Sequence, residues 1–180
     1  MRRSGARCRV MTTDAAALAR LRWRTAEPAD AIAVARAVDE WWERRLNHCV
    51  QPQLFEHFGD STFIVEDEGE LVAFLVGWLS QRYPDAGYVH FMGVRSDHRR
   101  LGLGRELYRR FAALARERGR TRIMAETGAF NTRSIAFHRS IGFTIEPGDE
   151  VVDGVAIHHD RIGIGGDYVV FSMDLRDAAL

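Results

Sequence analysis

The chain of 180 residues is long enough for one domain with a substantial core, and its apolar fraction of 46% and charged fraction of 28% are those of an ordinary globular protein. Its formal net charge is zero, so no overall field attracts it to nucleic acid or to an anionic membrane. Two cysteines, Cys8 and Cys49, are too few for a disulfide scaffold and lack metal-ligand spacing, so we expect no metal.

The amino-terminal segment is basic and lacks the apolar stretch of a secretory signal, and no segment is apolar enough to span a membrane. We therefore expect a cytoplasmic protein. Residues 1–19, rich in alanine and arginine, are predicted to be a flexible extension, with Met1 and Met11 as alternative starts. Residues 20–180 are predicted to form a single domain.

The first half of the chain is predicted to form two helices and three strands. Residues 21–25 alternate like a strand, and Glu27 to Asp30 carry the proline and acids typical of a helix start. The buried face of that helix is predicted to hold Ala31, Val34, Ala35, Val38, Trp41 and Trp42. Residues 51–58 are predicted to form a short helix that ends at Gly59. Residues 61–66 and 71–79 are predicted to pair as a hairpin.

The second half is organised around the stretch from Tyr88 to Gly119. Its β-branched and aromatic start predicts a strand over 88–94, and the apolar period after Gly104 predicts a helix that Gly119 ends. Further elements are predicted over 122–126, 132–141, 143–145 and 167–175, with a polar, glycine-rich loop at 147–166. This alternation of strands and helices predicts an α/β or α+β layered fold with a mixed sheet.

The turn between the central strand and helix is a candidate anion site. Its sequence is Arg99-Arg100-Leu101-Gly102-Leu103-Gly104. Glycines let backbone N–H groups approach a ligand closely, and a helix start favours negative charge, so a diphosphate is the expected ligand. An ordinary solvated turn is the alternative. Neither a GxxxxGK[ST] loop nor the third glycine of a dinucleotide-binding fingerprint is present.

Two motifs resemble those of the GCN5-related N-acetyltransferases (GNAT). Val94 followed by Arg99-x-x-Gly102-x-Gly104 resembles the acetyl-CoA signature Q/R-x-x-G-x-G/A, and the run from Asn131 to Phe143 resembles N-x-x-A-I-x-L-Y-x-x-L-G-F. The resemblance covers about residues 21–175. It implies a GNAT-like fold with a central, mixed, mostly antiparallel sheet of about six or seven strands, about four helices, and strands that splay apart at the acetyl-CoA site.

The resemblance also implies acetyl-CoA as cosubstrate, with its pantetheine arm along the central strand and its diphosphate on the turn. Asn131 resembles a family asparagine that contacts CoA, and it is equally a typical N-cap for the helix at Thr132. The implied cofactor-binding residues are Met92, Gly93, Val94, Arg99, Arg100, Leu101, Gly102, Leu103, Gly104, Arg105, Asn131, Ser134 and Phe137.

Glu126 is the first candidate for the general base. It stands five residues before Asn131, the spacing at which some GNAT members, notably ribosomal-protein N-terminal acetyltransferases, place a glutamate base. The alternative is an exposed strand-end acid that pairs with an arginine. His90 is the competing base, because an imidazole titrates near neutral pH, and alternation predicts that it shares a face with Met92 and Val94. A core histidine is the alternative for His90.

His138 stands seven residues after Asn131, where the family pattern has the tyrosine that protonates the CoA thiolate. A histidine can also donate a proton, and packing is the alternative. Two further groups have open interpretations. Asp39, Glu40 and Glu43 are a solvated edge or the mouth of a pocket for a cationic substrate. His158, His159 and Asp160 form a weak metal motif, and their loop is expected to be flexible or to cover the acceptor.

The expected function is an acetyl-CoA-dependent N-acetyltransferase. It would move the acetyl group to a primary amine of a small molecule, peptide or protein N-terminus by direct transfer in a ternary complex, because neither cysteine has a placed base. The alternatives are a non-catalytic CoA-binding regulatory module, which the missing tyrosine favours, and a nucleic-acid-binding domain, which the zero net charge disfavours. A monomer or a homodimer is expected, without nucleic-acid or membrane partners.

Overall fold

A computed structural model describes residues 15–161, 163, 165–178 and 180. The helices and strands follow in the order α1 (Ala15–Ala19), β1 (Arg22–Thr25), α2 (Asp30–Trp42), α3 (Pro52–Phe58), β2 (Phe63–Asp67), β3 (Glu70–Leu79), β4 (Ala86–Val94), α4 (Leu103–Glu117), β5 (Arg122–Gly128), α5 (Thr132–Ser140), β6 (Thr144–Ile145), β7 (Glu150–Val152), β8 (Val155–His159) and β9 (Asp167–Asp174). Three short 3-10 turns are η1 (Asn47–Cys49), η2 (Gly59–Ser61) and η3 (Ser96–His98).

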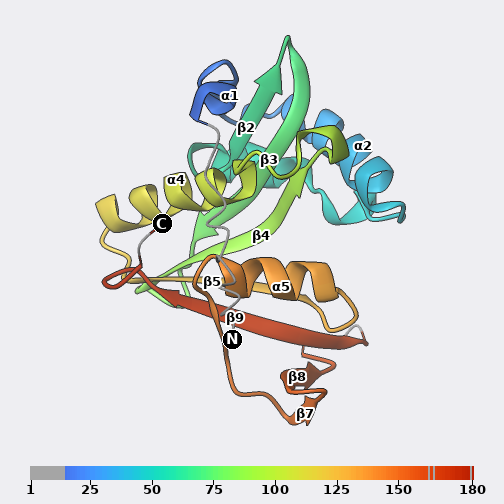
Figure 1. Cartoon of the computed structure of the whole chain (residues 1–180), viewed down its shortest axis with the longest axis vertical. Coiled ribbons are helices and arrows are strands. Elements are labelled where there is room, and N and C mark those ends of the chain that lie inside the picture. Colours follow the sequence, from blue (N-terminus) through green and yellow to red (C-terminus); the bar gives the residue numbers. More distant parts are fainter. Residues whose placement is uncertain (1–14, 162, 164, 179) are drawn as a thin grey trace, which may run out of the picture.

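The strands form one sheet in the order β1-β2-β3-β4-β5-β9-β8-β7, with β6 also paired to β9 (Figure 1). Only β4 and β5 pair in parallel; the other pairs of the described residues are antiparallel. The predicted mixed, mostly antiparallel sheet is therefore confirmed. The sheet is larger than expected, with nine strands among the described residues instead of six or seven. The described residues also form five α-helices instead of about four.

The additional strands come from the segment 147–166, which was expected to be a loop. Strands β7 and β8 form a hairpin in which Val152 pairs with Val155 across Asp153 and Gly154. Both turn residues have positive φ angles, 50° and 76°, as a type I′ turn requires. The expectation of a loop is wrong over these strands, because an Asp-Gly pair is itself a strong hairpin signal.

The amino-terminal extension expected over residues 1–19 lies mostly outside the described residues. Within it, α1 is described, and Leu18 packs against the core. The Trp23 indole Nε1 donates a hydrogen bond of 3.2 Å to the Leu18 carbonyl. None of the described helices combines the length and the apolarity that crossing a membrane requires.

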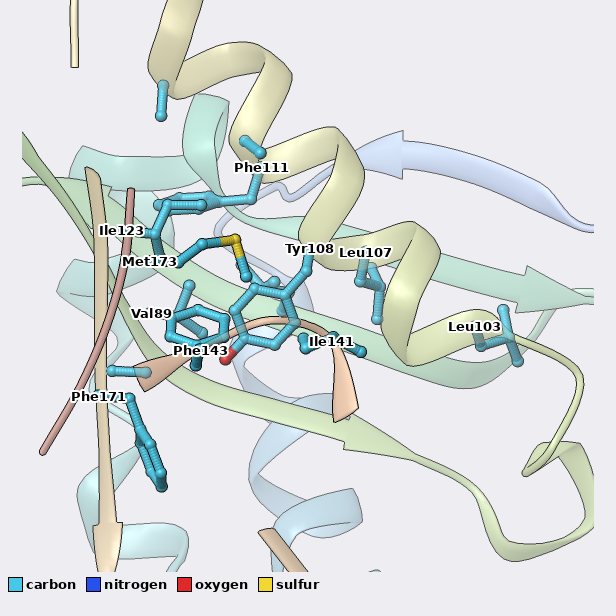
Figure 2. Close-up of a cluster of buried hydrophobic side chains, with 14 of the residues drawn as sticks. Val89, Leu103, Leu107, Tyr108, Phe111, Ile123, Ile141, Phe143, Phe171 and Met173 are labelled. Carbon is cyan, nitrogen blue, oxygen red and sulfur yellow. The ribbon is translucent and has the colours of Figure 1, made fainter. Parts of the chain in front are cut away.

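Helices cover both faces of the sheet, and each face has its own core. Helices α4 and α5 pack on one face, and α2 and α3 pack on the other. Figure 2 shows Leu107, Tyr108 and Phe111 pointing from α4 onto the sheet. A Cβ atom on Gly77 of β3 or on Gly87 of β4 would lie 2.9 Å from the Phe111 ring. Glycine at these two positions lets α4 approach the strands closely.

Strands β4 and β5 diverge after a short paired region. Their parallel register runs from Ala86 opposite Arg122 to Val89 opposite Ala125. Both strands continue beyond this point but no longer pair with each other. At the same point β4 contains an extra residue, because its register with β3 shifts between Val89 and Phe91. The expected splayed strands are therefore present, and a β-bulge at His90 accompanies them.

The bulge changes the face on which His90 lies. Met92 packs against the core under α4, whereas Phe91 packs against the core under α2. The His90 ring lies with Phe91, at 4.0 Å between ring centroids, and 5.4 Å from the Trp78 ring. The prediction that His90 shares a face with Met92 and Val94 is wrong, because the extra residue reverses the alternation of side chains.

Replacement of Phe111 by alanine is predicted to lower the free energy of unfolding by about 3–5 kcal/mol, because the fully buried ring leaves a cavity between α4 and the two glycines. Urea denaturation measures this change. Ile32→Ala, at a residue of α2 that is 64% exposed, is the control and is expected to change the free energy of unfolding by less than about 0.5 kcal/mol. A loss below about 1 kcal/mol for Phe111→Ala would contradict this packing.

Candidate functional site

The turn that leads from β4 into α4 presents a row of free backbone donors. Among the described residues, no acceptor is found for the backbone N–H groups of residues 100–105. Arg100 and Gly102 have positive φ angles of 67° and 88°, and α4 starts directly after Gly102. Unpaired N–H groups in a turn, together with the partial positive charge of a helix start, bind anions. The turn therefore fits a diphosphate.

The turn is held in place from both sides. The Arg99 Nε donates a 3.2 Å hydrogen bond to the Val94 carbonyl, and the buried Leu103 anchors the helix start in the core. On the other side, Arg105 Nη2 donates to the Ser140 carbonyl of α5 at 3.2 Å. A Cβ on Gly104 would lie 3.0 Å from the Phe137 ring. A side chain at position 104 would therefore press on Phe137 where α4 meets α5.

Sequence reasoning missed His98, which fixes the start of this turn. The imidazole is only 8% exposed, with Nδ1 2.8 Å from an Asp97 oxygen and Nε2 2.9 Å from an Asp67 oxygen. Burial by itself lowers the pKa of His98, but the hydrogen bonds to Asp97 and Asp67 raise it above the usual value. Asp67 lies far away in the sequence, so only the folded sheet reveals this link.

A second cluster lies where β4 and β5 diverge, on the face covered by α2 and α3. Register places Tyr88 of β4 beside Met124 of β5, so Tyr88 and Glu126 lie on one face. The Glu126 carboxylate is 18% exposed and forms a 3.1 Å ion pair with the Arg161 Nε. Burial, and after it the nearby Glu126 carboxylate, raise the pKa of Tyr88. Tyr88 and Arg161 were not among the predicted site residues, because only strand pairing brings them to Glu126.

His90 belongs to the same cluster. Burial lowers the pKa of His90, while contact with the Cys49 backbone and the charge of Glu126 oppose that shift. The imidazole is therefore mostly neutral at neutral pH. The structure thus brings together both predicted bases, Glu126 and His90, beside the Tyr88 hydroxyl. Their roles in catalysis remain predictions.

His138 lies on the opposite face of the sheet. Its ring stacks on Phe171 with centroids 4.4 Å apart, and it is 6% exposed. Nδ1 lies 2.8 Å from the Ser134 carbonyl, which can only accept, so Nδ1 carries the proton. Nε2 then accepts from the Tyr108 hydroxyl at 2.8 Å. The structure separates His138 from Glu126 and engages both ring nitrogens.

The other predicted cofactor residues cluster at the start of α5. The Asn131 Oδ1 accepts a 3.1 Å hydrogen bond from the Ser134 backbone, and its Nδ2 donates to Thr127 Oγ1 at 3.2 Å. Asn131 is therefore the N-cap of α5, one of its two predicted roles. Contact with CoA remains a prediction for Asn131 and Ser134. Phe137 is half-buried against the Tyr108 ring.

One residue from each of the two motifs with open interpretations, His159 and Asp39, makes contacts within the fold. His159 is exposed and pairs with Asp167 at 2.8 Å and Glu150 at 3.2 Å, and these carboxylates raise its pKa. No group of three or more potential metal ligands is found in the described part of the chain. Asp39 accepts hydrogen bonds from the backbone N–H groups of Leu46 and Asn47, at 2.6 and 2.8 Å, and so fixes the turn after α2.

A hollow of about 460 Å³ lies between α2 and the β2–β3 hairpin, and Glu40 is part of its wall. Its lining contains none of the candidate catalytic residues. Arg24 bridges Asp30 and Glu66 there, at 2.6 Å to each. These ion pairs tie β1 to α2 and β2.

The burial of His138 gives a pH-dependent stability. Burial lowers its pKa from an ordinary value of 6.5 to about 4, and the hydrogen bond with the Ser134 carbonyl opposes this shift. Below the ordinary value the unfolded chain binds the proton and the folded chain does not. His138 should therefore reduce the free energy of unfolding as the pH falls from about 6.5 to about 4, by up to about 3 kcal/mol.

Urea denaturation of the protein and of His138→Gln at several pH values between 7 and 4 measures this contribution. The variant should lose less stability over that range, because it removes the buried titrating group. The comparison cancels the titration of all other groups. Equal slopes for the two proteins would contradict a buried, neutral His138.

The comparisons with known proteins agree with this geometry. The family model for the Acetyltransferase (GNAT) family matches residues 16–143. Among solved structures, Ard1 from Thermoplasma volcanium is 21% identical, with a TM-score of 0.69 over 86% of this chain and 97% of that chain. The ribosomal-protein-S18-alanine N-acetyltransferase from Escherichia coli is 18% identical, with a TM-score of 0.63 over 86% and 94%.

A third solved structure is diaminobutyrate acetyltransferase EctA from Paenibacillus lautus in complex with L-2,4-diaminobutyric acid and coenzyme A. It is 23% identical, with a TM-score of 0.61 over 84% of this chain and 93% of that chain. No curated protein has significant sequence similarity to the chain. The family match spans more than half of the sequence and includes the β4–α4 turn, so the chain belongs to the GNAT family of acetyltransferases.

Proposed function

We propose that the protein transfers the acetyl group of acetyl-CoA directly to a primary amine in a ternary complex. The observation that carries the proposal is the divergence of β4 and β5, which separates a row of free N–H donors at residues 100–105 from the Glu126 cluster on the other face. A donor and an acceptor that enter from the two faces meet between these strands.

The donor side is built from β4, the turn and α5. Beyond Val89, β4 has β3 on one side and lacks its β5 partner on the other, so the backbone of Met92 to Val94 can bind an extended arm like an added strand. The N–H groups of residues 100–105 would hold the diphosphate, and the arginines of the turn add positive charge. Acetyl-CoA supplies an acetyl group activated as a thioester.

The acceptor side must remove a proton from an ammonium group. Glu126 is the proposed base because its carboxylate is only 18% exposed and lies beside Tyr88 on one face of the sheet. His90, mostly neutral because burial lowers its pKa, is proposed to accept a hydrogen bond from the same amine. Loss of the ammonium proton leaves the nitrogen lone pair that attacks the acetyl carbon.

His138 is proposed to be a structural group and not the acid for the departing sulfur. Its Nδ1–H is engaged with the Ser134 carbonyl, and its Nε2 accepts from Tyr108. Thiols have pKa values of about 8.5, so departure as a thiolate needs less assistance than departure of an alkoxide. The family tyrosine is thus replaced here by a Tyr108–His138 pair within the core.

The turn gives the first test of this function. Gly102→Val places a β-branched residue at a φ of +88°, which it adopts only with strain, so the row of N–H donors should be distorted. Calorimetric titration should show a Kd for acetyl-CoA that is higher by about 5- to 30-fold. Gly119→Val is the matched control, because Gly119 has a φ of +73° at the far end of α4 with open space around it.

Unchanged affinity of Gly102→Val for acetyl-CoA would contradict the role of this turn. An equal loss in Gly119→Val would assign the effect to helix stability instead of ligand contact. Urea denaturation of both variants checks that the two substitutions lower the free energy of unfolding by similar amounts.

The second test concerns Glu126. Glu126→Gln removes the proton acceptor and keeps the shape, so thiol release with a panel of primary amines should slow by about 100-fold or more. Its Kd for acetyl-CoA should stay within about twofold, because the donor binds at the other face. Glu117→Gln, at an exposed acid of α4, is the control and should keep full activity.

An unchanged rate in Glu126→Gln would remove it from the role of base. Tight CoA binding without thiol release from any amine, in the unaltered protein, would instead support the non-catalytic CoA-binding module.

A further inference from the structure

The ion pair between Glu126 and Arg161 places a positive charge directly on the proposed base. The Arg161 Nε lies 3.1 Å from Oε2 of Glu126, although the two residues are 35 positions apart in the chain. Their side chains are 31% and 18% exposed, so neither is fully solvated. Arg161 also acts electrostatically on Tyr88, which places its guanidinium within the same cluster.

An incoming ammonium group must share or displace this arginine to reach Glu126. If the acceptor is a plain cation, Arg161 loses its partner, and the partly buried cluster gains one positive charge. Leaving a partly buried charge without a partner is unfavourable. If the acceptor also carries a carboxylate, that carboxylate replaces Glu126 as the partner of Arg161, and the number of charge pairs is restored.

The chemistry of Arg161 fits this exchange. A guanidinium group presents several N–H donors in a planar arrangement that matches a carboxylate. Only its Nε bonds to Glu126 in the structure. Another arginine, Arg44, lies over the Phe130 ring at 4.5 Å, so its charge is already in contact with an aromatic face.

A second polar group on the same face lacks a partner. The Nε2 of His158 is buried and has no hydrogen-bond partner among the residues that the structure describes. Register places His158 opposite Tyr168 of β9, which pairs with Gly128, two residues beyond Glu126 on β5. Strand alternation therefore puts His158 on the Glu126 face. Buried polar atoms in proteins are normally satisfied, so this nitrogen also points to a polar ligand.

We propose that the acceptor is a small amine that carries a carboxylate, such as an amino acid, and that Arg161 binds this carboxylate while Glu126 binds the ammonium group. Arg161 is then the residue that determines specificity. This inference rests on the proposed function, because both the inference and the proposed function assign the amine-binding base to Glu126.

The test compares acids with their amides in binding and in transfer. Three amino acids, L-alanine, L-glutamate and L-lysine, and the α-carboxamide of each are titrated by calorimetry into the full-length protein with CoA present. In each pair the amide lacks the charge of the α-carboxylate that Arg161 would bind. We expect at least one acid to bind at least tenfold more tightly than its amide. Arg161→Gln should abolish this difference, and Arg161→Lys should keep part of it.

Arg118→Gln is the matched control, because Arg118 is exposed at the end of α4, and it should keep the full difference. Equal binding of acid and amide in all three pairs would overturn the proposal, as would a difference that survives in Arg161→Gln. Tighter amide binding in Arg161→Gln, with unchanged acid binding, would also overturn it, because Arg161 would then only block the base.

Thiol release with the same six compounds separates this inference from the proposed function. An acid that binds through Arg161 but is not acetylated would contradict the transferase activity and still support the binding role. Transfer to amides and acids at equal kcat/KM would support the transferase and contradict the role of Arg161.

Discussion

The separation of β4 from β5 is the constraint on which the rest of the site depends. Parallel pairing stops after Val89 and Ala125, and the bulge at His90 turns β4 away at the same point. A strand edge within a sheet normally has a partner, because unpaired backbone groups are costly to bury. The edge of β4 that β5 leaves unpaired is therefore the proposed site for an extended ligand, and residues 100–105 follow it with free N–H groups.

Packing on both faces fixes the position of β4. On one face, Phe111 fills the space over Gly77 and Gly87 and fixes α4 against β3 and β4. On the other face, a Cβ on Gly93 would meet the rings of Phe74 and Trp41, so α2 lies directly against β4 beyond the bulge. The two helical layers then have different proposed roles. In the proposed function, the layer of α4 and α5 forms the donor side, and the layer of α2 and α3 covers the acceptor side with Glu126, His90 and Tyr88.

Local sequence signals predicted the elements and the turn well. The strand–turn–helix from Tyr88 to Gly119 and the Asn131 cap depend on residues close together in the chain, and the structure contains them. The side on which His90 lies could not be predicted, because a bulge is defined by pairing with another strand. Tyr88 and Arg161 were missed for the same reason: strand pairing, and not sequence spacing, brings them to Glu126. The β7–β8 hairpin was predictable from Asp153-Gly154 and was missed.

A crystal structure of the protein with CoA tests the central claim most directly. The account predicts the diphosphate on the backbone N–H groups of residues 100–105, and the pantetheine arm along Met92 to Val94 with its sulfur between β4 and β5. A nucleotide bound elsewhere, such as in the hollow between α2 and the β2–β3 hairpin, or an arm that does not enter between the diverging strands, would contradict it.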